Sequence, residues 1–166
     1  RASTSISPSN GGVYSRNLGH PDDQVLIHSS AATTNRPAGT VISAPKGWYD
    51  AGDYNKYIVN SGISTYTLLI AFEHYNSYYT SKNIDIPETG NTLPDILDEV
   101  KWNLDWMLAM QDPSDGGVYH KLTGLNFSGI VMPENYSLDR YVVQKSTAAA
   151  LNFAAVMAVA SRIFAN

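Results

Sequence analysis

Apolar side chains recur at helical spacing in three segments of the chain, near residues 61–76, 94–111 and 146–164. A spacing of three and four residues places side chains on one face of an α-helix, so each segment is predicted to be helical. Pro94 suits the first turn of the second helix, and Asp95 and Asp98 suit its positive end. The first and third segments are apolar on nearly every face, which predicts burial on more than one side.

The segments between these helices are rich in Ser, Thr, Asn, Gly and Pro, which favours loops. Short strands are predicted at 25–28 and 40–42, and the turn at 115–117 precedes another at 118–122. The predicted fold class is therefore all-α, with long loops and a short hairpin.

Composition narrows the functional classes. Charged residues make up 16% of the chain, the net charge is −4 and no basic run occurs, so nucleic-acid binding lacks electrostatic support. The chain has no cysteine, which excludes disulfides and thiolate chemistry. Asn152 interrupts the apolar third helix, and Ser161 and Arg162 end the run. We therefore expect a helix buried in a helical assembly and no membrane partner.

The segment at 47–57 carries the clearest chemical signal, because Asp50 and Asp53 are separated only by Ala and Gly and are flanked by aromatic residues. Two neighbouring carboxylates can serve as a base and orient a water molecule. Aromatic side chains offer apolar faces to sugar rings, and the 11 tyrosines suit a neutral polar ligand. The alternative is a structural loop in which Asp50 is a turn residue and Asp53 caps a helix.

The run WYDAGD at 48–53, followed by Lys56, resembles the signature of glycoside hydrolase family 9. The similarity continues in three further runs: PDILDEVKW at 94–102, GVYHK at 117–121 and VMP at 131–133. Tyr54 and Tyr57 stand where many members have His and Phe. The runs at 53–62 and 20–24 resemble a subgroup whose catalytic domain often follows an immunoglobulin-like module.

This resemblance implies a secreted enzyme that hydrolyses β-1,4-glucan with inversion on an (α/α)6 toroid. We expect no cofactor and no metal bound by this segment. The general base maps onto Asp53, and Asp50 helps to hold the attacking water. His120 maps onto a sugar-contacting position. Three aromatic residues, Trp48, Tyr49 and Tyr54, are expected to line the same cleft. A cellulose-like polysaccharide or cello-oligosaccharide is the expected ligand.

The general acid of the resembled family is a Glu near the end of the catalytic domain. The chain contains four glutamates, Glu73, Glu88, Glu99 and Glu134, and none lies late in the sequence. Twelve helices with connections need about 200 residues, so 166 residues cannot close the toroid. We expect residues 1–166 to be the N-terminal portion of a longer catalytic domain, with the remainder as partner. The alternative is a non-catalytic carbohydrate-binding or structural remnant.

Overall fold

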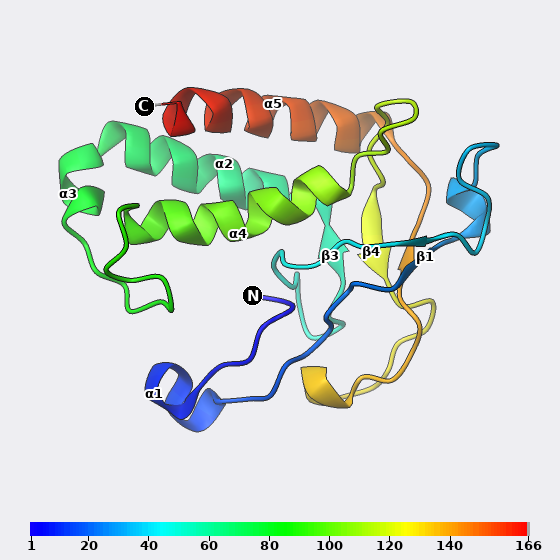
Figure 1. Cartoon of the computed structure of the whole chain (residues 1–166), viewed down its shortest axis with the longest axis horizontal. Helices are drawn as coiled ribbons and strands as arrows, with labels where there is room; N and C mark the ends of the chain where they lie inside the picture. Colours follow the sequence, from blue (N-terminus) through cyan, green and yellow to red (C-terminus); the bar gives the residue numbers. More distant parts are fainter. Residues whose placement is uncertain (166) are drawn as a thin grey trace.

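A computed structural model describes residues 1–165, and three long helices dominate it (Figure 1). These helices are α2 (Ile58–His74), α4 (Asp95–Ala109) and α5 (Thr147–Phe164). Their bounds confirm the three predicted helices to within a few residues. Ser146 caps α5 by accepting a hydrogen bond from the backbone N–H of Ala149 at 3.1 Å.

The remaining elements are short. Two further helices are α1 (Pro8–Gly11) and α3 (Asn76–Thr80). The 3-10 turns are η1 (Gly12–Tyr14), η2 (Ser29–Ala31) and η3 (Pro133–Asn135). The strands are β1 (Val25–Ile27), β2 (Val41–Ile42), β3 (Lys56–Tyr57), β4 (Lys121–Thr123) and β5 (Tyr141–Val142).

The five strands form one mixed sheet in the order β2-β1-β5-β4-β3. Strand β1 pairs with β5 in parallel, and the other neighbouring strands are antiparallel. In β3 and β4, Tyr57 lies opposite Lys121 and Lys56 opposite Leu122. Strand β3 runs directly into α2, so the residues just before β3 lie near the N-terminal end of that helix.

The prediction of an all-α class needs correction at this point. The long helices are present, and so are the two strands predicted at 25–28 and 40–42. These two strands, however, belong to a five-stranded sheet. Each strand has only two or three residues, too few for alternation of apolar and polar positions to be visible. The described part of the chain is thus a helical layer with a small mixed sheet at one end.

Helix α2 lies between α4 and α5 and packs against both (Figure 1). At its contact with α5, a side chain on Gly62 would overlap the amide oxygen of Asn152, so the glycine permits the close approach. At its contact with α4, the buried amide of Asn103 donates to the hydroxyls of Ser61 and Thr65. These contacts fix the N-terminal half of α2 relative to both neighbours.

The outer sides of these helices remain apolar and exposed. Ile63 on α2 is 61% exposed and Leu151 on α5 is 67% exposed. By length and composition alone, α5 would be able to cross a membrane, and 28% of that segment is buried here. Within the described residues α2 is covered by two helices and α5 mainly by α2, so the burial predicted for them on several sides is met only in part.

Candidate active site

Residues 47–55, called the aspartate loop below, lead into β3 and α2. Gly47 has φ +81°, and a side chain there would lie 2.8 Å from the ring of Trp106. The backbone N–H of Trp48 donates to the side chain of Asn103 on α4 at 3.2 Å. The start of the loop is therefore fastened to α4, which leaves the two aspartates on the turn that follows.

The two aspartates occupy a tight turn. The N–H of Asp50 donates to the carbonyl of Asn55 at 2.9 Å, and the N–H of Tyr54 donates to Ala51 at 3.1 Å. Tyr54 has φ +56°, a left-handed conformation that costs a tyrosine energy and reverses the chain here. As a result, Asp50 and Asp53 lie on the same small turn at the entrance to α2.

Neutral donors hold both carboxylates. Asp50 is exposed and accepts a hydrogen bond from the amide of Asn60 at 2.8 Å. Asp53 is half-buried and accepts from the backbone and side-chain N–H groups of Asn55, at 3.1 and 2.8 Å, and from Tyr57 at 3.3 Å. Within residues 1–165 neither aspartate forms an ion pair. Asp53 does not cap α2, because Tyr57 occupies the N-cap position.

A hollow of about 150 Å³ lies beside Asp50, and its lining includes Trp48, Tyr49 and Tyr57. The indole N–H of Trp48 donates to Glu99 on α4 at 2.6 Å, which fixes the plane of its ring. The hollow therefore joins one aspartate to two of the aromatic residues predicted to meet sugar.

Tyr49 and Tyr54 also face a cluster behind the loop. The Tyr49 hydroxyl hydrogen-bonds Nδ1 of His20 at 2.7 Å, and that of Tyr54 donates to the carbonyl of Val131. The Tyr49 and Tyr54 ring centroids are 5.1 Å apart. Burial lowers the pKa of His20 to about 4 and raises that of Tyr49, so both are neutral at pH 7. Both tyrosine hydroxyls are thus already hydrogen-bonded within the protein. A ligand would therefore contact the rings of Tyr49 and Tyr54 rather than their hydroxyls.

His120 precedes β4 and lies on the backbone next to the start of α2. Its carbonyl accepts from the N–H of Ile58 at 3.1 Å, and its Nδ1 hydrogen-bonds the Ser146 hydroxyl at 2.9 Å. Within residues 1–165 Nε2 of His120 forms no hydrogen bond, so this ring nitrogen is the one that can meet a ligand. No hydrogen bond joins His120 to either aspartate in the part of the chain described.

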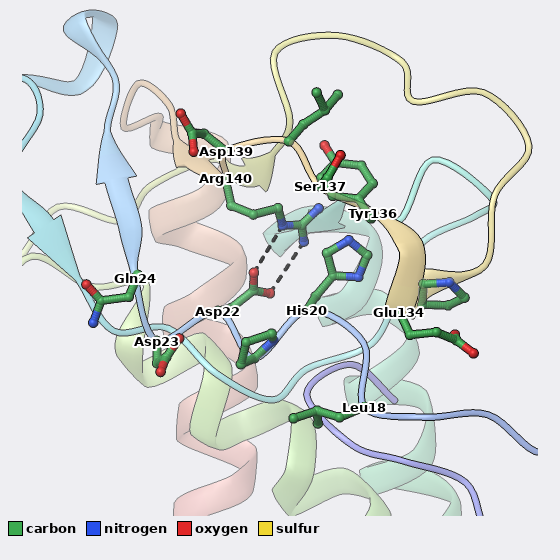
Figure 2. A pocket seen from close by; sticks show the side chains of 13 residues that line it. Leu18, His20, Asp22, Asp23, Gln24, Glu134, Tyr136, Ser137, Asp139 and Arg140 are labelled. Atoms are coloured by element: carbon green, nitrogen blue, oxygen red, sulfur yellow. Dashed lines mark hydrogen bonds and ion pairs between the residues drawn. The ribbon is translucent and has the colours of Figure 1, made fainter.

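A buried ion cluster of Asp22, Lys56 and Arg140 lies next to the start of the aspartate loop, where Lys56 donates to the carbonyl of Lys46. Figure 2 shows part of this cluster. Asp22 contacts Nζ of Lys56 at 2.8 Å and Nε of Arg140 at 3.0 Å. Burial lowers the pKa of Lys56 to about 8 against the opposing effect of Asp22. Burial also acts to raise the pKa of Asp22, but Lys56 and Arg140 outweigh it and lower that pKa. Asp22 and Lys56 are therefore both charged at pH 7.

The sequence alone does not join the members of this cluster. Lys56 and Arg140, which pair with Asp22, lie 34 and 118 positions from it in the sequence, and no local pattern reveals pairs so far apart. The run at 20–24, which resembles the family subgroup, was the available signal.

Within residues 1–165 no three or more candidate metal ligands are grouped so that they could hold a metal ion. Asp112, in the loop that follows α4, contacts Lys145 at 2.6 Å and Arg36 at 3.3 Å. Burial acts to raise the pKa of Asp112, and Lys145 foremost lowers it below its usual range. This carboxylate is neutralised by side chains of the protein.

The glutamates make their contacts with groups other than the two aspartates. Three are paired with arginines: Glu73 with Arg162, and Glu88 and Glu99 with Arg1. The fourth, Glu134, lies in η3 and lines a hollow with His20 (Figure 2). Glu73 is near the far end of α2, about 20 Å along the helix from its start. None of the four hydrogen-bonds Asp50 or Asp53 within the described chain.

Comparison with known proteins decides the family. The model of the family described as Glycosyl hydrolase family 9 matches residues 4–166. The chain belongs to this family. It is 56% identical over 166 residues to the xyloglucan-specific endo-beta-1,4-glucanase BoGH9A of Bacteroides ovatus, covering 100% of this chain and 28% of that protein.

Other members of glycosyl hydrolase family 9 show the same pattern. Endoglucanase D of Acetivibrio thermocellus is 41% identical, over 99% of this chain and 26% of its own length. The solved structure named Bacteroides ovatus GH9 superimposes with a TM-score of 0.96 at 56% identity, covering 99% of this chain and 30% of that one. The chain therefore spans less than a third of the length of these family 9 relatives.

Proposed function

We propose that this chain is the N-terminal portion of a secreted family 9 endoglucanase that hydrolyses β-1,4-glucosidic bonds with inversion. The aspartate turn carries this proposal. It places two carboxylates together at the start of α2, held by neutral donors and free of ion pairs among the described residues. The family membership and the names of the relatives, a xyloglucan-specific endo-beta-1,4-glucanase and an endoglucanase, support the substrate class.

Asp53 serves as the general base in this proposal. An inverting enzyme needs a carboxylate that takes a proton from water while the water attacks the anomeric carbon, opposite the leaving oxygen. Asp53 is the better-held of the two aspartates, since its oxygens accept three hydrogen bonds. Asp50 is more exposed and accepts one, which suits a group that helps to position the same water.

The aromatic residues and His120 provide the sugar contacts. Trp48 presents a ring fixed by Glu99 beside the hollow at Asp50, and the ring of Tyr49 lines the same hollow. Tyr54 holds the turn and packs on Tyr49. Nε2 of His120 is the ring nitrogen available to a sugar hydroxyl. We propose that these four residues and the two aspartates line one cleft.

The general acid is a glutamate outside the chain. An inverting pair is separated by ~6.5–9.5 Å across the scissile bond. Three of the four glutamates present are paired with arginines, and the fourth, Glu134, lines a hollow with His20. We propose that the rest of the polypeptide supplies the acid and completes an (α/α)6 toroid, whose further helices cover the exposed sides of α2 and α5.

Turnover of a soluble β-glucan by the full-length enzyme tests this function. Asp53→Ala is expected to lower kcat by ~10²–10⁴-fold, the range for a general base. Asp50→Ala should cost less, and the double variant should be no worse than Asp53→Ala because both groups act on one water. Azide with Asp53→Gly should partly restore turnover and give an azido sugar. Near-normal turnover by Asp53→Ala would overturn the proposal.

The second candidate is a non-catalytic remnant that binds carbohydrate or serves as structure. The lack of a glutamate beside Asp53 within the described residues favours it. Mass spectrometry of the natural polypeptide separates the two functions. A mass several times 18.1 kDa supports the enzyme, whereas a mass equal to 18.1 kDa supports the remnant.

A further inference from the structure

The side chain of Asn55 bridges the aspartate loop and the chain beyond β4. Its Nδ2 donates to Oδ2 of Asp53 at 2.8 Å, and its Oδ1 accepts from the backbone N–H of Gly124 at 3.3 Å. The Gly124 N–H requires an acceptor, so the oxygen of the amide must face it. This fixes the NH₂ group of Asn55 toward Asp53, with an orientation that does not depend on a ligand.

Tyr57 reaches the same oxygen of Asp53 from β3. Its hydroxyl lies 3.3 Å from Oδ2 of Asp53 and 3.3 Å from Nδ2 of Asn55. The ring is held in place because Nζ of Lys121, its neighbour across the strands, lies 5.2 Å from the ring centroid. Both Tyr57 contacts are longer than the 2.8 Å contact from Asn55, so Tyr57 is the weaker support.

The backbone adds a third restraint. The N–H of Asn55 donates to Oδ1 of Asp53 at 3.1 Å, so the two oxygens of the carboxylate are held by different donors. A carboxylate held at both oxygens cannot rotate freely about its side-chain bonds. Proton abstraction from a bound water depends on such placement, because an error of about 1 Å in a reacting group can cost ~10²-fold in rate.

We propose that Asn55 and Tyr57 are positioning residues that orient Asp53 for its reaction with water. This inference rests on the proposed function and deepens it. Neither side chain needs to touch the substrate for this role, since each acts through the carboxylate of Asp53. Their removal should therefore change kcat and leave KM nearly unchanged.

The expected sizes follow from the contacts. A hydrogen bond to a charged group contributes ~1.5–3 kcal/mol, which corresponds to about 10- to 150-fold in rate. Asn55→Ala should lower kcat by roughly 10- to 100-fold, because it removes the shorter contact and the bridge to Gly124. Tyr57→Phe should lower kcat by only about 2- to 10-fold, because its contact is longer.

A double-mutant cycle in the full-length enzyme separates positioning from general structural damage. Asn55→Ala and Tyr57→Phe are each measured alone and in the Asp53→Ala background, with soluble β-glucan as substrate. If both residues act through Asp53, neither should lower kcat further once that carboxylate is gone. The matched controls are Asn17→Ala and Tyr78→Phe, two exposed positions, which should retain wild-type kcat in both backgrounds.

The outcomes are distinct. Losses that persist in the Asp53→Ala background, a rise in KM that accounts for the whole effect, or an Asn55→Ala enzyme with wild-type kcat would overturn the positioning role alone. Wild-type turnover by Asp53→Ala itself would overturn the proposed function and this inference with it. Tyr57→Phe removes one oxygen and keeps the ring under Lys121, so it tests the role even where Asn55→Ala fails to fold.

Discussion

Replacing Lys56 with Met should destabilise the protein severely, because it removes one charge from a buried cluster. The Lys56 side chain is fully buried, and its Nζ contacts Asp22 at 2.8 Å and the carbonyls of Ala44 and Lys46 at 3.0 and 2.6 Å. Methionine keeps the length of the apolar stem. It leaves Asp22 with Arg140 as its one remaining cation and deprives two carbonyls of their donor.

The magnitude follows from these contacts. Removing one partner of a buried ion pair costs ~3–5 kcal/mol, and the surviving contact with Arg140 places this case near 3 kcal/mol. A typical domain has only ~5–15 kcal/mol of stability, so the loss is a large fraction of the whole. Lys101→Met is the matched control: Lys101 is 54% exposed and pairs with Asp105 on one helix face, a contact worth ~0.5 kcal/mol or less.

Urea unfolding of the full-length protein measures both variants. The urea midpoint should fall strongly for Lys56→Met and barely for Lys101→Met. The slope of the unfolding free energy against urea concentration should stay unchanged in both variants. Adding Asp22→Asn to Lys56→Met should cost less than the sum of the single effects, since the two residues are in contact. A Lys56→Met protein within about 0.5 kcal/mol of wild type would refute the reasoning, because it would mean that the cluster contributes no net stability.

Three further predictions concern the same framework. Burial lowers the pKa of His20 to about 4, so the unfolded chain binds a proton on His20 at a higher pH than the folded chain does, and stability should fall as pH drops from about 6.5 to 4. Urea midpoints across that range should decline less steeply for His20→Asn than for wild type, and equal declines for the two proteins would contradict this role of His20. Gly62→Ala should destabilise by ~1–3 kcal/mol because its methyl group meets Asn152, whereas Thr67→Ala on the exposed side of α2 should change the melting temperature little. Residues 1–166 expressed alone should self-associate through the exposed sides of α2 and α5, and a monodisperse monomer in analytical ultracentrifugation would count against this.

The helices were predictable from the sequence because each carries several turns of periodic apolar positions. The α4 start also has local signals: Asp95 and Asp98 lie in its first turn as expected, and Pro94 occupies the N-cap, one position before the expected first turn. The sheet was not predictable as a unit. Its strands have two or three residues, and the parallel pairing of β1 with β5 joins positions more than 100 residues apart.

The site shows the same division. Asp50 and Asp53 could be found because their neighbours form a compact local motif, whereas the left-handed conformation of Tyr54 that closes their turn has no signal in the sequence. The donors that hold Asp53 are also local, at Asn55 and Tyr57, but sequence alone gives no reason to prefer them over other polar neighbours. Folding is needed to bring in Gly124, which orients the Asn55 amide.

Backbone strain links the buried ion cluster to the aspartate loop. His20, Asp22, Lys46 and Tyr54 are non-glycine residues with φ between +43° and +68°, and all four surround or belong to the loop. Such conformations cost ~1–3 kcal/mol each and persist only where neighbouring contacts over-determine them. Contacts of Lys56 with Asp22 and with the carbonyl of Lys46 hold two of the four directly. The ion cluster thus offsets strain in the backbone that leads into the aspartate loop, and we expect a weakened cluster to disturb the start of that loop at Lys46.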